Sequence, residues 1–359
     1  MILFFSSPIG LGHITRDIAI MEKIIREYNY TKFSIVTGST AYGFLSKLAN
    51  SNFDLNFIYN LYFPPSFSIT DGKLTRGFYW LLRYVYYYNQ CNKNLQRFFL
   101  TENRSHLLSD VIISDEDFAS LSFTKKFKSK RIFVTDILST QFSRSFLFSK
   151  FEKKLNNSMS ALIRSAECVI LPEIGEDRDN LFYVGPIVRE IQESRNELRK
   201  KLSFDKKTIL LSVGGTNSGI YLLKKTIESF LRLKNNKEYD LVILSSYRFE
   251  LPKLDSNCKF MGIVSNGHEY VKSCDLLISL AGKSTIDESM VYGIPGIFIP
   301  IKNHFEQEYR AASMGFKYDD IYNLDRLIEE RLSSFDHATQ VKVDNGVMKS
   351  AEMIYSFLE

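Results

Sequence analysis

Short runs of apolar residues, each followed by a turn and then by residues with helical spacing, recur along the chain. They occupy residues 2–5, 33–36, 110–113, 131–135, 167–171, 208–213, 241–245, 259–264 and 276–280. Continuous apolar runs of this length are typical of strands buried on both faces of a parallel sheet, and their alternation with helices is typical of βαβ units. The pattern therefore predicts an α/β protein built from Rossmann-like sheets.

A break in this pattern divides the elements into two groups. The segment 183–189 (YVGPIVR) is followed by a charged run at 189–207, and the succession of strand, glycine loop and helix then starts again. A chain of 359 residues also suits two domains of about 150–180 residues better than one core. We predict an N-terminal domain at 1–186, with a C-terminal helix at 346–359 packing back on it, and a second domain at 187–345.

The most informative stretch of the second half runs from 274 to 308. Its first strand, at 276–280, is followed by a turn containing Gly282 and then by a helix. Ser284 and Asp287 have the spacing of a capping box, which predicts that the helix starts at Ser284.

A second strand, at 297–301, leads into the polar residues 303–308, so two strand ends bring polar groups to one edge of a sheet. Open α/β sheets bind their ligands at that edge. A glycine turn before a helix offers backbone N–H groups and the positive end of the helix dipole to a phosphate. Glu288, about one turn into the helix, can accept hydrogen bonds from ribose hydroxyls. We infer a site for a nucleotide diphosphate; the alternative is an ordinary βαβ unit, which also has glycine turns and capped helices.

The first half opens with a similar arrangement. The turn at 6–16 (SSPIGLGHITR) joins the first strand to a helix and places His13 at or just before the helix start. The spacing is not the dinucleotide fingerprint GxGxxG, because Thr15 stands at the third glycine position. His13 is a candidate catalytic or phosphate-contacting residue, with helix capping as the alternative. Arg16 contacts an acidic ligand or belongs to a structural ion pair.

Three acidic residues, Asp115, Glu116 and Asp117, follow the predicted strand at 110–113. They formally read DxD, a metal-binding signature of some nucleotide-sugar enzymes, and carboxylates suit Mg²⁺ or Mn²⁺. A general base, or a hydrogen-bond partner for an acceptor hydroxyl, is the more economical role in this half of the chain. Capping of the next helix is the alternative.

Aromatic and basic residues are concentrated in two segments of the first half. Of the 40 residues at 61–100, 12 are aromatic, among them Trp80, and basic residues such as Arg83 lie between them. The second segment, 142–154 (FSRSFLFSKFEKK), has the same character. This combination suits a membrane interface with anionic headgroups. The alternative is that the aromatic residues form core and the charges face solvent. Single-stranded nucleic acid uses similar residues, but no other feature supports it as a partner.

Composition narrows the class of protein. The net charge of +5 is weak support for nucleic acid binding. The four cysteines, at 91, 168, 258 and 274, form no CxxC pair, which argues against a zinc site or a disulfide framework and fits a reducing cytoplasm. No apolar run reaches the ~20 residues that a spanning helix needs, and the apolar start lacks the basic residues of a signal peptide.

Four short motifs, taken in order, resemble those of a known enzyme class. They are GLGHITR at 10–16, SDED at 114–117, GPIVR at 185–189 and FEQ at 305–307. With the glycine loop after residue 213 and the GKSTIDE segment at 282–288, they resemble GT-B glycosyltransferases, in the branch of the peptidoglycan N-acetylglucosaminyltransferase. A little-characterised prokaryotic group marked by GxGHxxR, SDxE, GPIxR and FEQ is closer still. The resemblance covers nearly the whole chain and implies two Rossmann-like domains that face each other across a cleft.

The resemblance implies that the C-terminal domain holds a nucleotide-sugar donor without an essential metal. The residues implied to bind it are Gly214, Gly215, Thr216, Gly262, Val264, Gly282, Lys283, Ser284, Thr285, Glu288, His304, Glu306 and Gln307. Within this set, Glu288 holds the ribose, Gly262 and Val264 lie near the nucleobase, and Glu306 and Gln307 contact the transferred sugar. The other residues lie near the diphosphate or the sugar, and a lysine at position 283 is a departure from the family pattern that adds a possible phosphate contact.

On the acceptor side, the resemblance places His13 near the reacting centre. The catalytic base is His13 or one of Asp115, Glu116 and Asp117, and this choice stays open because Glu116 stands beside the aligned Asp117. The candidates for acceptor binding are Gly12, Arg16, Trp80 and Arg83.

The expected function is that of an inverting, metal-independent glycosyltransferase. Its donor is a UDP-sugar, with N-acetylglucosamine or another hexose as the sugar, and its acceptor is a lipid-linked or membrane-proximal glycan. We expect a cytoplasmic protein that is peripheral on the inner face of the cell membrane, with the anionic membrane surface as a partner and no nucleic acid. Two alternatives are a UDP-sugar 2-epimerase and a non-catalytic, membrane-associated scaffold subunit that binds nucleotide.

Overall fold

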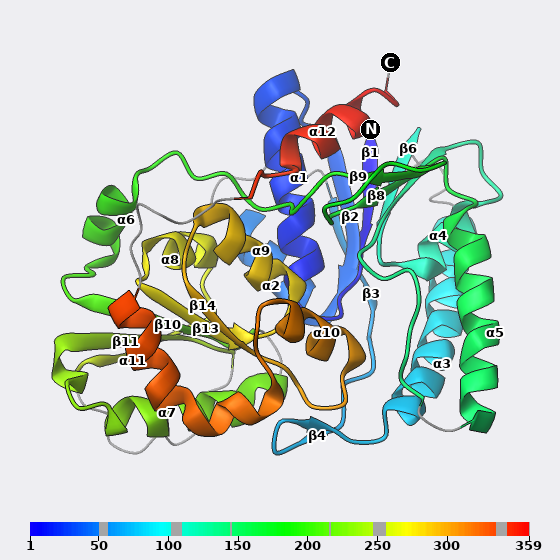
Figure 1. Cartoon of the computed structure of the whole chain (residues 1–359). Helices are drawn as coiled ribbons and strands as arrows, with labels where there is room; N and C mark the ends of the chain where they lie inside the picture. Colours follow the sequence, from blue (N-terminus) through cyan, green and yellow to red (C-terminus); the bar gives the residue numbers. More distant parts are fainter. Residues whose placement is uncertain are drawn as a thin grey trace. The chain divides into compact units, whose positions relative to one another are not determined.

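The chain folds into two compact units, each built around a parallel sheet (Figure 1). The computed structural model describes residues 1–49, 57–101, 110–143, 146–214, 217–246, 256–334 and 343–358. The first unit comprises Met1–Ser66, Arg76–Arg189 and Asp344–Glu359, and the second comprises Phe67–Thr75 and Glu190–Val343. The main boundary thus follows Arg189 rather than residue 186. The segment Phe67–Thr75, which the sequence pattern assigns to the N-terminal domain, belongs to the second unit.

In the described part of the first unit, seven strands form one parallel sheet in the order β3-β2-β1-β6-β7-β8-β9. The strands are β1 (Ile2–Ser6), β2 (Phe33–Gly38), β3 (Phe57–Tyr62), β6 (Val111–Asp115), β7 (Lys130–Val134), β8 (Cys168–Leu171) and β9 (Leu181–Tyr183). Every residue of β1, β2 and β6 is buried, as expected for strands with helices on both faces of the sheet.

The helices of the first unit pack on both faces of this sheet. They are α1 (Gly12–Tyr28), α2 (Ser39–Ala49), α3 (Gly77–Gln96), a π-helical turn (Arg97–Thr101), α4 (Phe118–Thr124), α5 (Phe146–Ile163) and α12 (Val347–Tyr355). The last of these, α12, lies beside α1 (Figure 1), where the rings of Tyr28 and Tyr355 stack with centroids 4.0 Å apart. The end of the chain therefore completes the core of the first unit.

The second unit repeats the architecture with a smaller sheet. Its described part contains a five-stranded parallel sheet in the order β12-β11-β10-β13-β14. The strands are β10 (Lys207–Ser212), β11 (Tyr239–Leu244), β12 (Cys258–Gly262), β13 (Leu276–Leu280) and β14 (Gly296–Ile299). The helices are α6 (Arg195–Leu202), α7 (Ile220–Arg232), α8 (Gly267–Ser273), α9 (Lys283–Tyr292), α10 (Phe305–Ser313) and α11 (Leu324–Ser334), with 3₁₀ turns at Asn217–Gly219, Asn236–Glu238 and Tyr318–Asn323. A hairpin of β4 (Ile69–Thr70) and β5 (Lys73–Leu74) completes the unit.

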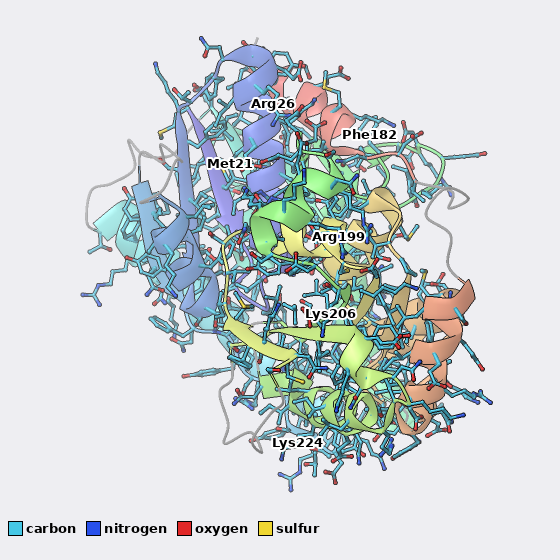
Figure 2. The ribbon with its side chains drawn as sticks, turned by 90° about the vertical axis from the view of Figure 1, so that its left-hand side faces the viewer. Met21, Arg26, Phe182, Arg199, Lys206 and Lys224 are labelled. Atoms are coloured by element: carbon cyan, nitrogen blue, oxygen red, sulfur yellow. The ribbon has the colours of Figure 1, made fainter. Side chains whose placement is uncertain are left out.

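Helix α6 is fixed to the second sheet by a carboxylate at the start of β13. Arg195 and Arg199, the latter labelled in Figure 2, donate to Asp275 at 2.7 and 2.8 Å. The same carboxylate accepts from the backbone N–H of Thr208 at 2.8 Å. Burial raises the pKa of Asp275, but these donors outweigh it and hold that pKa below its ordinary value. One side chain thus joins a helix and two strands at the edge of the sheet opposite the strand ends discussed next.

The start of α9 differs from the predicted capping box. The helix begins at Lys283, with Gly282 as its N-cap in extended conformation and no side-chain cap. The carboxylate of Asp287 pairs with the ammonium of Lys283 at 2.5 Å instead of reaching back to the backbone of Ser284. The prediction of a capping box was wrong because the glycine already supplies the turn into the helix, two residues before the predicted start.

Candidate functional site

Both sheets reverse their strand order at one point, and several of the candidate residues lie in the loops that follow the strands there. In the first unit β1 lies between β2 and β6, and in the second unit β10 lies between β11 and β13. At such a switch point, the connections that follow two neighbouring strands of one sheet run in opposite directions. This leaves a crevice for ligands outside the carboxyl ends of the strands. In register, Ser6 pairs with Asp115 and Ser212 with Ser279, so the loops that follow these residues start side by side.

In the first unit the switch point brings His13 onto Asp115. The Nδ1 atom of His13 lies 2.9 Å from Oδ1 of Asp115, and Nε of Arg16 donates to Oδ2 of the same carboxylate at 2.8 Å. Asp115 is fully buried, whereas the side chain of His13 keeps 16% of its surface exposed. His13 is not a helix cap, because Leu11 occupies the N-cap position of α1 and His13 lies inside the first turn.

The carboxylate of Asp115 orients the ring of His13. Burial raises the pKa of Asp115, but the guanidinium of Arg16 and the contacts with His13 outweigh it and lower that pKa. An ionised carboxylate only accepts hydrogen bonds, so Nδ1 of His13 is the donor in the contact with Asp115; the same Nδ1 lies 3.3 Å from Nη2 of Arg16. Arg16, with 7% of its side chain exposed, is thus part of a buried ion pair, the second of the two roles considered for it.

Glu116 approaches the same histidine from the other side. Its Oε2 lies 3.5 Å from Nε2 of His13, and its Oε1 accepts from the backbone N–H of Asp136 at 3.1 Å and from the hydroxyl of Thr135 at 3.3 Å. The backbone of Glu116 has φ of +46°, a left-handed conformation that is uncommon for residues other than glycine and clusters at functional sites.

Asp117 points away from His13. Its Oδ1 accepts from the N–H groups of Ala119 and Ser120 at 3.1 and 3.2 Å, so it caps α4. Its Oδ2 accepts from the hydroxyl of Tyr62. Helix capping was the alternative role for these three acids. Asp117 has that role, whereas Asp115 and Glu116 contact the histidine. A catalytic role for any of the three stays a prediction.

The remaining acceptor candidates lie on α1 and α3. Gly12 is the first residue of α1. Trp80 is buried and stacks on Tyr84, with centroids 5.4 Å apart, and the pKa of Tyr84 is raised by burial and by the charges of Asp117 and Glu116. Arg83 donates to the carbonyl of Ser66 at 3.4 Å. An aromatic chain thus connects Trp80 to the acidic loop, while Arg83 contacts the backbone.

In the second unit, glycines follow the two neighbouring strands β10 and β13 at the switch point. Gly214 follows β10, is exposed and has φ of +75°, which a residue with a Cβ rarely adopts. Gly215 and Thr216 lie outside the described residues. After β13, Gly282 leads into α9, so the first-turn residues Ser284 and Thr285 lie where the helix presents its N–H groups.

Side chains of α9 add charge near this turn. Lys283 pairs with Asp287 within the helix, and Glu288 is half-buried in its second turn.

At the other end of the sheet edge, Gly262 ends β12 with φ of +77°, and its carbonyl accepts from the N–H of Ser245 at 3.1 Å. Val264 follows it and packs on the core.

The turn after β14 carries the predicted sugar contacts. His304 is the N-cap of α10 and is 6% exposed, and burial lowers its pKa to about 4. Gln307 accepts from the backbone N–H of Ile301 at 3.0 Å, and Glu306 accepts from Nε of Arg310 at 3.2 Å. The histidine is therefore neutral at neutral pH. Gln307 helps to hold the turn, whereas Glu306 pairs within α10.

The order of these candidates along the sheet edge matches the order of groups in a nucleotide sugar. From β12 through β10 and β13 to β14, the edge presents Gly262 and Val264, then the loops of Gly214 and Gly282, then His304. The predicted nucleobase, diphosphate and sugar contacts follow the same sequence. Five strands at a spacing of ~4.8 Å extend over about 19 Å, so an elongated ligand can lie across them.

The sequence pattern did not identify two residues that contact the candidate site. Asp136 follows β7 and lies 3.8 Å from Arg16; the rule that polar residues follow strand ends could have identified it. Phe67, in the hairpin of the second unit, lies with its ring centroid 5.1 Å from that of His304. Local sequence gave no signal for the second contact, because the two residues are far apart along the chain.

Comparison with known proteins decides the class of the second unit. The model of the glycosyltransferase family 28 C-terminal domain matches residues 209–336, which include the glycine loops and the turn before α10. This part of the chain is a glycosyltransferase family 28 C-terminal domain. It contains every candidate for donor binding and ends beyond α11.

Several sequence relatives of the chain are glycosyltransferases by name. An uncharacterized glycosyltransferase of Methanosarcina acetivorans is 28% identical over 134 residues, which is 37% of this chain and 33% of that protein. The UDP-N-acetylglucosamine--N-acetylmuramyl-(pentapeptide) pyrophosphoryl-undecaprenol N-acetylglucosamine transferase of Alkaliphilus metalliredigens is 30% identical over 176 residues, which is 43% of this chain and 48% of that protein. The chain thus matches between a third and about half of the length of these relatives.

Solved structures extend the comparison from the family 28 domain to the whole fold. Arabidopsis thaliana UGT89C1 complexed with UDP superposes with a TM-score of 0.63 at 13% identity, covering 100% of this chain and 99% of that chain. The fold is GT-B, as expected from the motifs. None of the helices in the described residues is long and apolar enough to cross a membrane.

Proposed function

We propose that the protein is an inverting, metal-independent glycosyltransferase that moves a hexose from a UDP-sugar to a lipid-linked glycan. The observation that carries the proposal is the pair of glycine loops at the switch point of the family 28 domain, with base and sugar candidates in order on either side. UDP in the complex of Arabidopsis thaliana UGT89C1 and UDP-N-acetylglucosamine in the name of the Alkaliphilus enzyme support this donor class.

The second unit supplies the leaving-group chemistry. When the anomeric carbon is attacked, the bond to the diphosphate breaks and UDP leaves with an added negative charge. The first-turn N–H groups of α9 and the positive end of its dipole suit that charge, and preorganised donors of this kind contribute several kcal/mol to many reactions. In this proposal Glu288, half-buried in α9, accepts hydrogen bonds from the ribose.

The first unit supplies the base. Asp115 holds Nδ1 of His13, so Nε2 is the atom that takes the proton of the acceptor hydroxyl as that oxygen attacks the sugar. General-base catalysis of this kind contributes on the order of 10²–10⁴-fold to the rate. A single displacement inverts the configuration at the anomeric carbon.

The reaction does not require a metal in this proposal. The two aspartates of the DxD motif already bond to protein groups, Asp115 to Arg16 and His13, and Asp117 to Tyr62 and the N-terminus of α4. Neutralisation of the diphosphate then falls to the helix dipole and the backbone donors.

An anionic membrane surface is the proposed partner of the first unit. Helices α3 and α5 lie side by side (Figure 1), joined by the stacked rings of Phe78 and Phe148 at 4.1 Å. The two helices expose Tyr79, Tyr86, Phe146 and Phe148, with exposed fractions of 55%, 67%, 73% and 49%. Lys150, Lys153 and Lys154 are exposed on α5. Pyrophosphoryl-undecaprenol in the name of the Alkaliphilus enzyme supports a lipid-linked acceptor. In this proposal the protein meets that acceptor as a cytoplasmic, peripheral protein on the inner face of the cell membrane.

Calorimetric titration with UDP-sugars tests the donor site. We expect the wild-type protein to bind UDP and a UDP-hexose without Mg²⁺, and Glu288→Ala to weaken binding about tenfold or more, because a charged hydrogen bond contributes about 1.5–3 kcal/mol. Asp205→Asn, an exposed change in the same unit, serves as the control. Unchanged binding by Glu288→Ala contradicts the site, and incubation with donor alone separates transfer from 2-epimerisation, since only an epimerase converts it.

A further inference from the structure

A short segment from the first half of the chain belongs to the second unit. The residues Phe67–Thr75 lie in that unit, although the chain on both sides of them belongs to the first. The strands β4 and β5 pair antiparallel, with Ile69 opposite Leu74 and Thr70 opposite Lys73. We refer to Phe67–Thr75 as the hairpin.

Backbone hydrogen bonds attach the hairpin to the turn after β14. The N–H of Leu74 donates to the carbonyl of Lys302 at 2.8 Å, and the N–H of Lys302 donates to the carbonyl of Gly72 at 2.9 Å. The side-chain amide of Asn303 donates to the carbonyl of Leu74 at 3.4 Å. The hairpin and the turn therefore share one fixed register.

The tip of the hairpin is fixed by two tyrosines of the second unit. The hydroxyl of Tyr318 donates to the carbonyl of Asp71 at 2.6 Å. Gly72 has φ of +69°, and a Cβ at this position would lie 2.7 Å from the ring of Tyr221. The ammonium group of Lys73 lies 5.7 Å from the centre of the Tyr318 ring, within the range of a cation–π interaction. Only a glycine fits here without displacing a ring.

The turn to which the hairpin is bound is unusual in itself. Asn303 has φ of +67°, and its N–H donates to Glu308 of α10 at 3.1 Å. Gln307 of the same helix holds the N–H of Ile301 at 3.0 Å. Left-handed residues persist where the surroundings hold them and are found at functional sites. The turn is held by α10 on one side and by the hairpin on the other.

The first residue of the hairpin reaches the histidine at the end of this turn. The ring of Phe67 is tilted by 58° against that of His304, with centroids 5.1 Å apart. The histidine is buried and neutral at neutral pH, because burial lowers its pKa to about 4. A neutral imidazole has one donor and one acceptor nitrogen, which suits sugar hydroxyls better than phosphate.

We propose that the hairpin determines which sugar the donor site accepts, with Phe67 positioning the ring of His304 and the hairpin backbone positioning the turn that carries it. The inference rests on the proposed function, since it concerns the end of the donor site assigned to the transferred sugar. Phe67 is a positioning residue, and the ligand class is the hexose of a UDP-sugar.

The test compares binding of UDP with binding of intact UDP-hexoses by the full-length protein. We expect Phe67→Ala to reduce the preference among UDP-glucose, UDP-galactose and UDP-N-acetylglucosamine and to lower kcat/KM for the preferred donor on the order of 10²-fold, the effect of a misplacement of about 1 Å. Affinity for UDP stays unchanged, because the nucleotide contacts lie on other strands. Phe67→Tyr keeps the ring and restores the preference.

Two further variants distinguish a specific effect on sugar preference from a loss of folding. Tyr318→Phe removes only the hydroxyl bonded to Asp71 and is expected to weaken sugar preference in the same direction. Thr70→Ala, an exposed change in the same hairpin, leaves preference and affinity unchanged. A loss of UDP binding in Phe67→Ala that is as large as the loss of sugar binding shows a general structural role and overturns the inference.

The outcome also separates this inference from the proposed function. If the wild-type protein prefers one UDP-sugar and Phe67→Ala keeps that preference, the hairpin proposal is wrong and the donor site stands. If the wild-type protein binds no UDP-sugar, the proposed function fails, and the inference fails with it.

Discussion

His13 depends on one buried carboxylate for its orientation. Asp115 bonds both His13 and Arg16 and has no exposed surface, so it fixes the imidazole and balances the guanidinium at once. Removing it would take from the buried guanidinium of Arg16 its nearest carboxylate and leave only Asp136, at 3.8 Å, and breaking a buried ion pair costs several kcal/mol. A substitution of Asp115 would therefore change both the catalytic rate and the stability of the fold. His13 is the better residue to change when the catalytic rate is measured.

We predict that His13→Ala lowers kcat by about 10²–10⁴-fold, the usual contribution of a general base, and leaves the affinity for UDP unchanged. Steady-state kinetics with a UDP-sugar and a lipid-linked acceptor measure the first quantity, and calorimetry measures the second. Arg26→Ala, an exposed change near the end of the same helix (Figure 2), is the control and keeps full activity. A His13→Ala protein with wild-type kcat would remove this residue from the mechanism.

At the scale of elements, the second sheet depends on the cluster around Asp275. This residue joins α6, β10 and β13 through Arg195, Arg199 and the N–H of Thr208. Its pKa in the folded protein is lower than in the unfolded chain. A lowered pKa stabilises the fold above the unfolded value of about 3.9, and this stability is lost as pH falls through the folded value.

Asp275→Asn is accordingly predicted to destabilise the second unit by about 3 kcal/mol at pH 7, because a partly buried carboxylate loses charged hydrogen bonds that contribute about 1.5–3 kcal/mol each. The melting transition of that unit should fall by roughly 10 °C in scanning calorimetry. The difference from wild type should shrink in acid, because protonation removes the same charge. Asp205→Asn, in the exposed turn before β10, is the control. A difference from wild type that persists after the carboxyl of Asp275 is protonated in the folded protein would show that charge is not the cause.

At the scale of the whole molecule, charge and exposed aromatic residues combine on α3 and α5. Each basic residue near an anionic membrane contributes about 1 kcal/mol to binding. We predict that the protein sediments with anionic vesicles at low salt, and that the combined change Lys150→Glu, Lys153→Glu and Lys154→Glu weakens this binding by at least about 10²-fold.

A matched control for the vesicle experiment changes net charge by the same amount elsewhere. Lys224, labelled in Figure 2, Lys234 and Lys237 are exposed on the second unit, and their combined change to glutamate should leave vesicle binding nearly intact. If both triple variants lost vesicle binding equally, the net charge of the protein, and not the surface of α3 and α5, would be responsible for binding to the vesicles. No binding by the wild type would remove the membrane surface as a partner.

The sequence by itself determined the class of fold and the local form of the site. Buried strands appear as apolar runs because both faces of a parallel sheet are covered, and loops that approach a phosphate need glycine, as at Gly214 and Gly282. These signals are local, so a single sequence contains them. The same locality caused the error at α9, where Ser284 has the spacing of a cap but Gly282 already makes the turn.

Only the tertiary structure decided which of these parts meet. Strand order is set by hydrogen bonds between residues far apart in the chain, and it placed Asp115 and Glu116 against His13 while Asp117 capped α4. It also assigned the hairpin to the second unit, because backbone pairing with Lys302 and a tyrosine hydroxyl bind it there. The periodicity of the sequence does not indicate such contacts, because they join residues far apart in the chain and form only when the chain folds.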